Sequence, residues 1–98
     1  MEDSTNRLDG YGEQVRRLHE RLQNERWPQP YMFKFIMPND RATIDKVLET
    51  LPRSGEPRFS NSRNGKYTCI TCVAPMPSAE AVMEVTTRAC DIDGVISL

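Results

Sequence analysis

The first part of the chain has the hydrophobic spacing of an amphipathic helix. Its apolar residues recur at alternating steps of three and four, which places them on one narrow seam, and arginines and glutamates fill most of the other positions. Pro28 and Pro30 cannot continue a helix, so we expect the helix to end near Arg26. The expected seam consists of Leu8, Tyr11, Val15, Leu18 and Leu22.

From residue 31 onward, strand and helix patterns alternate. Residues 31–37 are aromatic or apolar except at Lys34, which predicts a central strand. Two sets of residues then recur at the spacing of one helical face, and each set predicts a helix. The first set is Ile44, Val47, Leu48 and Leu51, and the second is Ala79, Val82, Val85, Thr86 and Ala89.

Three further segments predict strands. Residues 58–63 are polar and weak as a strand, residues 66–74 alternate between two faces, and residues 95–98 form a short last strand. Within residues 66–74, one set of alternate side chains is expected to point inward. This set comprises Thr68, Ile70, Cys72 and Ala74.

Turn residues between these segments indicate how the elements begin and end. Asn39 or Asp40 can cap the first of the two later helices and Ser78 the second, because their side-chain oxygens accept hydrogen bonds from unpaired backbone amides. Asn64 and Gly65 readily supply the two positive φ angles of a type I′ turn, which predicts a two-residue hairpin.

The order strand, helix, strand, strand, helix, strand predicts an α+β fold, the ferredoxin-like βαββαβ sandwich. Two right-handed crossovers give one four-stranded antiparallel sheet with two helices on one face. Residues 1–30 are expected to form an N-terminal helical arm and a proline-containing linker, and residues 31–98 the domain. The arm either lies across its own sheet or pairs with the arm of a second protomer. The short, stiff linker favours the second arrangement, so we expect a homodimer.

Composition and charge narrow the range of partners. The chain has 98 residues, of which 38% are hydrophobic, and this suits one domain with a modest core. A net charge of −1 offers no long-range attraction to nucleic acid or to anionic membranes, so we expect neither as a partner. With three cysteines and no signal-peptide or membrane-spanning pattern, the sequence leads us to expect a cytoplasmic protein with reduced thiols.

Three segments of the chain resemble the YbeD-like bacterial family of unknown function. They are residues 31–38, residues 64–67 at the expected hairpin, and residues 94–98, and the similarity extends over roughly residues 27–98. The resemblance implies a ferredoxin-like fold similar to the ACT regulatory domains, which sense small molecules. The family has no established catalytic residues, so the resemblance transfers none to this chain.

The residue types that most often carry chemistry have structural interpretations here. Cys69 and Cys72 match a C-x-x-C pattern, but residues three apart on a strand project to opposite faces, so we expect small packed side chains and no metal site. His19 is the only histidine and is expected to be solvated. An RNA-recognition domain shows paired aromatics on this strand, where Tyr67 is the only one. We expect no cofactor and no enzyme activity.

Two groups remain as candidate ligand-binding residues. Asn39, Asp40 and Arg41 place backbone amides and a guanidinium at a helix N-terminus, which suits an anion unless a capping side chain occupies those amides. Lys34 and Tyr67 are expected beside each other on the open sheet face, either as a functional patch or as a lysine stem lying over an aromatic ring.

The sequence as a whole favours a non-enzymatic, regulatory binding module. In this interpretation the domain senses a small metabolite in the manner of ACT domains, or it docks to a partner enzyme. The alternative is a structural adaptor whose N-terminal amphipathic helix mediates a protein–protein interaction.

Overall fold

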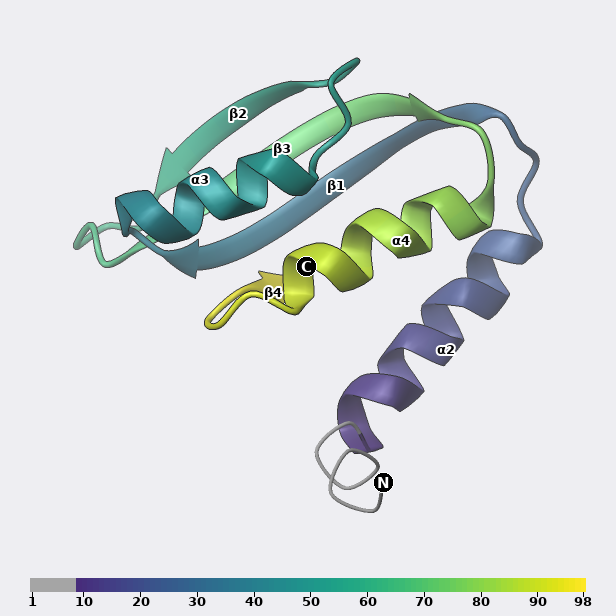
Figure 1. Ribbon diagram of the computed structural model, residues 1–98, viewed down its shortest axis with the longest axis horizontal. Helices are drawn as coiled ribbons and strands as arrows, with labels where there is room; N and C mark the ends of the chain where they lie inside the picture. Colours follow the sequence, from purple (N-terminus) through teal and green to yellow (C-terminus); the bar gives the residue numbers. More distant parts are fainter. Residues whose placement is uncertain (1–8) are drawn as a thin grey trace.

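A four-stranded antiparallel sheet organises the protein, whose computed structural model describes the chain at residues 9–98 and its side chains from residue 12 (Figure 1). Three helices accompany the sheet in this part of the chain. In chain order the elements are α2 (Asp9–Gln23), β1 (Gln29–Pro38), α3 (Arg41–Thr50), β2 (Glu56–Asn61), β3 (Tyr67–Met76), α4 (Ala79–Cys90) and β4 (Ile96–Ser97).

The strand order is β2-β3-β1-β4, so β1 and β3 form the centre of the sheet. These two strands pair along ten residues, from Gln29 opposite Met76 to Pro38 opposite Tyr67. The short strand β4 pairs with the C-terminal half of β1, where the Leu98 amide donates to the Lys34 carbonyl at 2.9 Å. The predicted α+β class and single antiparallel sheet are confirmed, and the arrangement is compatible with a ferredoxin-like fold.

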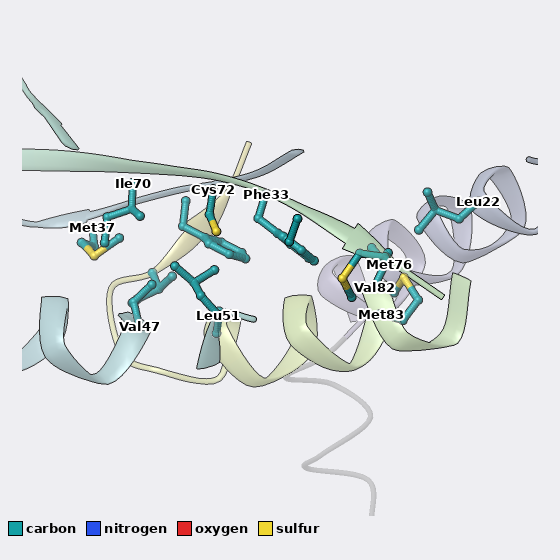
Figure 2. Close-up of a cluster of buried hydrophobic side chains, with 14 of the residues drawn as sticks. Leu22, Phe33, Met37, Val47, Leu51, Ile70, Cys72, Met76, Val82 and Met83 are labelled. Carbon is teal, nitrogen blue, oxygen red and sulfur yellow. The ribbon is translucent and has the colours of Figure 1, made fainter. Parts of the chain in front are cut away.

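The core lies between one face of the sheet and helices α3 and α4 (Figure 2). Strand β3 alternates strictly, and all four of its predicted inward side chains are buried. Side chains two residues apart on a strand share a face. On the same face of the sheet, β1 therefore supplies three large buried side chains, Phe33, Phe35 and Met37. Val47 of α3 and Val82 of α4 close the layer from the other side and are 0% exposed.

Both predicted helix caps are present. Asp40 rather than Asn39 is the N-cap of α3, where its carboxylate accepts from the Thr43 amide at 3.1 Å. Ser78 caps α4 by accepting from the Ala81 amide at 3.1 Å. Each cap satisfies one of the backbone donors that a helix leaves unpaired in its first turn.

The connection between β2 and β3 is longer than the predicted two-residue hairpin. The Ser62 amide donates to the Tyr67 carbonyl, so the loop holds four residues, 63–66, and the Gly65 amide bonds back to the Ser62 carbonyl. Gly65 has a φ of 76°, but Asn64 does not have the positive φ of a type I′ turn, so that prediction is wrong. The Asn64 side chain instead accepts from the Ser62 hydroxyl and the Lys66 amide, which stabilises the wider loop.

Helix α2 packs against α4, on the helical side of the protein (Figure 1). The predicted arrangement in which the arm lies across its own sheet is wrong, because α2 packs on α4 and not on the open sheet face. Pairing with the arm of a second protomer stays a prediction, and the described seam residues contact their own chain. Leu22 is 1% exposed and belongs to the core, while Val15 and Leu18 pack against the core. The helix ends at Gln23, where the Trp27 indole N–H donates to the Leu22 carbonyl at 2.9 Å.

The two cysteines of β3 provide a matched test of the fold. Cys72 is 1% exposed among core residues, and burial raises the pKa of its thiol, whereas Cys69 lies on the outer face of the strand. Cys72→Ser should lower the free energy of unfolding by about 1–3 kcal/mol, because serine would bury an unpaired hydroxyl. Cys69→Ser should change it by less than about 0.5 kcal/mol. Urea denaturation of both variants checks this, and similar losses would contradict the assigned faces.

Candidate functional site

The predicted anion-binding residues after β1 are engaged within the chain. The Asn39 amide donates to the Lys66 carbonyl at 2.9 Å and its side-chain amide donates to the Gly65 carbonyl at 3.0 Å, which ties this loop to the β2–β3 turn. Bonds from the Thr43 hydroxyl and then the Thr43 amide lower the pKa of the Asp40 carboxyl. Asp40 is therefore a cap, and the interpretation of this loop as a structural connection accounts for its hydrogen bonds.

Arg41 and Lys34 are both on the surface, but neither meets its predicted neighbours in a binding site. The Arg41 side chain is 90% exposed and reaches only Asp45, one helical turn later, at 3.5 Å. Lys34 pairs in register with Thr71, and Tyr67 pairs with Pro38. The prediction that Lys34 lies beside Tyr67 is wrong, because four residues of strand, about 13 Å, separate their positions along the same face.

The predicted interaction seam is divided between described and undescribed residues. Val15, Leu18 and Leu22 pack against the core of their own chain. Leu8 lies outside the described residues, and so does the side chain of Tyr11. The described part of the seam therefore docks α2 onto the domain.

Polar contacts join α2 to the start of α4. His19 Nε2 lies 3.3 Å from Glu80 Oε2, and Gln23 Nε2 donates to the same oxygen at 3.5 Å. The backbone amide of Glu80, in the first turn of α4, and then the His19 side chain lower the pKa of the Glu80 carboxyl. The expectation of a solvated His19 is thus met only in part, because the side chain is 38% exposed but pairs with a second helix.

A groove of about 290 Å³ lies between α2, α4, β1 and the segment around β4. The helices lie close together where α4 begins and diverge from there, as Figure 1 shows. A more open depression of about 790 Å³ also borders both helices, and two of its polar groups, His19 and Glu80, pair with each other. The 290 Å³ groove is lined by Gln14, Val15, Arg17, Leu18, Arg21, Tyr31, Thr86, Cys90, Ser97 and Leu98.

Thr86 is the unusual member of this lining. It is 5% exposed, yet its hydroxyl has no hydrogen-bond partner among residues 12–98. The adjacent Thr87 hydroxyl, by contrast, donates to the Met83 carbonyl at 2.9 Å. A buried polar group without a partner costs about 1–3 kcal/mol, so native structures keep few of them and each requires an explanation.

Tyr31 adds a second polar group at the groove. Its ring is half-buried and meets Phe33 edge-on, with a centroid distance of 4.8 Å. Burial raises the pKa of the Tyr31 phenol, the nearby Arg21 charge offsets part of that rise, and the Glu25 charge adds to it. The phenol therefore stays protonated at neutral pH and keeps its O–H as a hydrogen-bond donor.

The sequence placed Thr86 on an inner helix face but did not indicate a groove. The lining residues come from four separate segments, and only the docking of α2 beside α4 brings them together. A polar residue in an otherwise apolar helical row was the one available signal.

Comparisons with protein-family models, with curated proteins and with solved structures find no match to this chain. Among the described residues, no helix has the length and apolar content that a membrane span requires.

Leu22 tests whether the arm is part of the folded unit. Leu22→Ala should lower the free energy of unfolding by about 2–5 kcal/mol, because it removes a fully buried side chain from the contact between α2 and the domain. Arg26→Ala, at an exposed position just after the helix, should change it by less than about 0.5 kcal/mol. Equal stabilities in urea denaturation would show that the arm is not docked.

Thr86 and Thr68 form a second matched pair, because both are at most 5% exposed. The Thr68 hydroxyl donates to the Ser60 carbonyl at 3.4 Å, so Thr68→Val should cost about 0.5–1.5 kcal/mol. Thr86→Val should leave stability unchanged or raise it by up to about 2 kcal/mol, because it removes an unpaired buried hydroxyl. Urea denaturation measures both variants. If Thr86→Val loses as much stability as Thr68→Val, the Thr86 hydroxyl already has a partner in the native protein.

Proposed function

We propose that this protein is a cytoplasmic, non-enzymatic regulatory module of ferredoxin-like fold that binds a small metabolite in the groove beside α2. The observation that carries the proposal is the buried, unpartnered hydroxyl of Thr86 in the groove lining. A ligand that bonds to this hydroxyl would remove the cost of leaving it unsatisfied. The resemblance to YbeD-like proteins and to ACT domains supports a sensing role of this kind.

The geometry of the groove is typical of small-molecule sites. Such sites combine an apolar surface with a few polar groups that fix the orientation of the ligand. Here Val15 and Leu18 supply apolar surface, and the Tyr31 and Thr86 hydroxyls supply directional bonds. The alternative role as an adaptor through the seam of α2 has less support, since the described seam residues are engaged within the chain.

A thermal-shift screen of a metabolite library tests this function. A compound that binds only the native state, at a hundred times its dissociation constant, should stabilise the protein by about 2.7 kcal/mol and raise its melting temperature. Thr86→Val should abolish or reduce the shift, whereas Thr68→Val should retain it. If the screen finds no compound, and pull-down from native lysate captures a partner enzyme instead, the module acts by docking and the metabolite proposal fails.

We also propose that the open face of the sheet contacts a second copy of the chain. Four apolar side chains gather there, Met32 and Ile36 of β1, Val73 of β3 and Ile96 of β4, and three of them are 49–60% exposed. The face runs for about 33 Å along β1 and β3. A roughly square patch of about 800 Å², the area that each partner buries in a standard interface, has sides of similar length.

The charges of this face suit a two-fold arrangement. Glu56 pairs with Val73 across the sheet, and Arg58 and Lys34 both pair with Thr71, two residues earlier on β3. Acidic and basic side chains therefore lie next to each other on this surface. A copy related by two-fold symmetry can set these opposite charges against each other, because each contact of such an interface occurs twice.

Sedimentation velocity with two exposed apolar positions tests the dimer. Val73→Glu should shift the protein towards monomer, because it places a charge within the proposed apolar contact. Phe59→Glu is the matched control, since Phe59 is 54% exposed but lies opposite the inward-facing Ile70 and so off the open face. A wild-type protein that is monomeric at high micromolar concentration would end this proposal.

A further inference from the structure

We infer that the groove beside α2 accepts a small amphipathic anion, a carboxylate attached to an apolar or aromatic body. This inference rests on the proposed function and assigns the ligand its chemical class. Three properties of the lining carry it: the sign of its charged side chains, the nature of its apolar surface, and the position of its unsatisfied hydroxyl.

The charged side chains of the lining, among the residues that the structure describes, are both cationic. Arg17 and Arg21 lie one helical turn apart on α2 and both border the groove, while the lining includes no aspartate or glutamate side chain among the described residues. Arg17 makes a surface ion pair with Glu13 at 3.2 Å, but Arg21 has no ion-pair partner within residues 12–98. Guanidinium groups bind carboxylates through paired, charge-assisted hydrogen bonds, so this rim favours an anionic head group.

The remaining lining favours an apolar body of limited size. Val15 and Leu18 contribute aliphatic surface, and the contact with Phe33 holds the Tyr31 ring in place as an aromatic wall. A volume of about 290 Å³ lies at the small end of the range for small-molecule sites, which is about 300–1,000 Å³. The groove therefore favours a small ligand.

Thr86 and Tyr31 determine how such a ligand would be held. The Thr86 hydroxyl is both a donor and an acceptor, and the protonated Tyr31 phenol is a donor, so each can bond to a carboxylate oxygen. An anion that reaches Thr86 satisfies the buried hydroxyl and meets the arginine charges together. An ammonium group would instead be repelled by both arginines.

Three probes that share one body and differ in charge test the class of ligand. They are 3-phenylpropionate, 3-phenylpropanol and 3-phenylpropylamine, titrated into the full chain and followed by amide chemical-shift changes at residues 12–21 and 86–90. The propionate should bind about tenfold more tightly than the alcohol, with the amine weakest, as expected for a charge-assisted contact. Added salt should lower the affinity for the propionate and leave the affinity for the alcohol unchanged.

Variants separate this site from a general effect of charge. Arg21→Met keeps the apolar stem and should reduce propionate affinity about tenfold, and Arg53→Met, at an exposed arginine outside the groove, should have no effect. Thr86→Val should lower the affinity for the propionate while leaving the protein folded. An amine that binds as tightly as the propionate, or shift changes confined to the open sheet face, would overturn the inference.

The outcomes also distinguish this inference from the proposed function. If all three probes bind in the groove with equal affinity, the groove is a small-molecule site but not one for anions, and only the ligand class is wrong. If neither these probes nor any compound of the metabolite library changes the shifts at Val15 and Thr86, the proposed metabolite-binding function fails as well.

Discussion

The pairing of β1 with β3 is the interaction on which the rest of the structure depends. Ten residues of each strand lie in register, and their inward side chains, among them Phe33 and Ile70, form one side of the core. Both edge strands attach to this pair, β2 to β3 and β4 to β1. A shift of one residue in this register would turn the buried side chains of one strand towards solvent, so the core and the sheet order depend on the same alignment.

The features that the sequence predicted well are those that local chemistry determines. The alternation of β3 and the caps at Asp40 and Ser78 depend on residues close together in the chain. The alternation and the Ser78 cap were predicted with the correct side chains, and Asp40 was one of the two residues predicted for the other cap. The turn at Asn64 was wrong because its side-chain oxygen bonds to Ser62 and Lys66, an alternative to the left-handed backbone that asparagine also tolerates.

The candidate site could be predicted much less well, because it depends on contacts between distant segments. Lys34 and Tyr67 do share a face, as predicted, but their separation depends on the β1–β3 register, which periodicity alone does not give. The groove required the position of α2, and the proline linker was a poor guide to it. Docking against α4 makes α2 a wall of the groove, whereas the sequence suggested a separate interaction element.

The contact that ends α2 gives the protein an internal optical reporter. Trp27 is the sole tryptophan of the chain, its ring packs against the core, and its indole N–H is bonded to the Leu22 carbonyl at 2.9 Å. Release of the arm would transfer this indole from a partly buried, hydrogen-bonded position to water. Intrinsic fluorescence therefore reports the association of α2 with the domain in the unlabelled protein. Backbone circular dichroism reports global unfolding, so the two events can be measured separately.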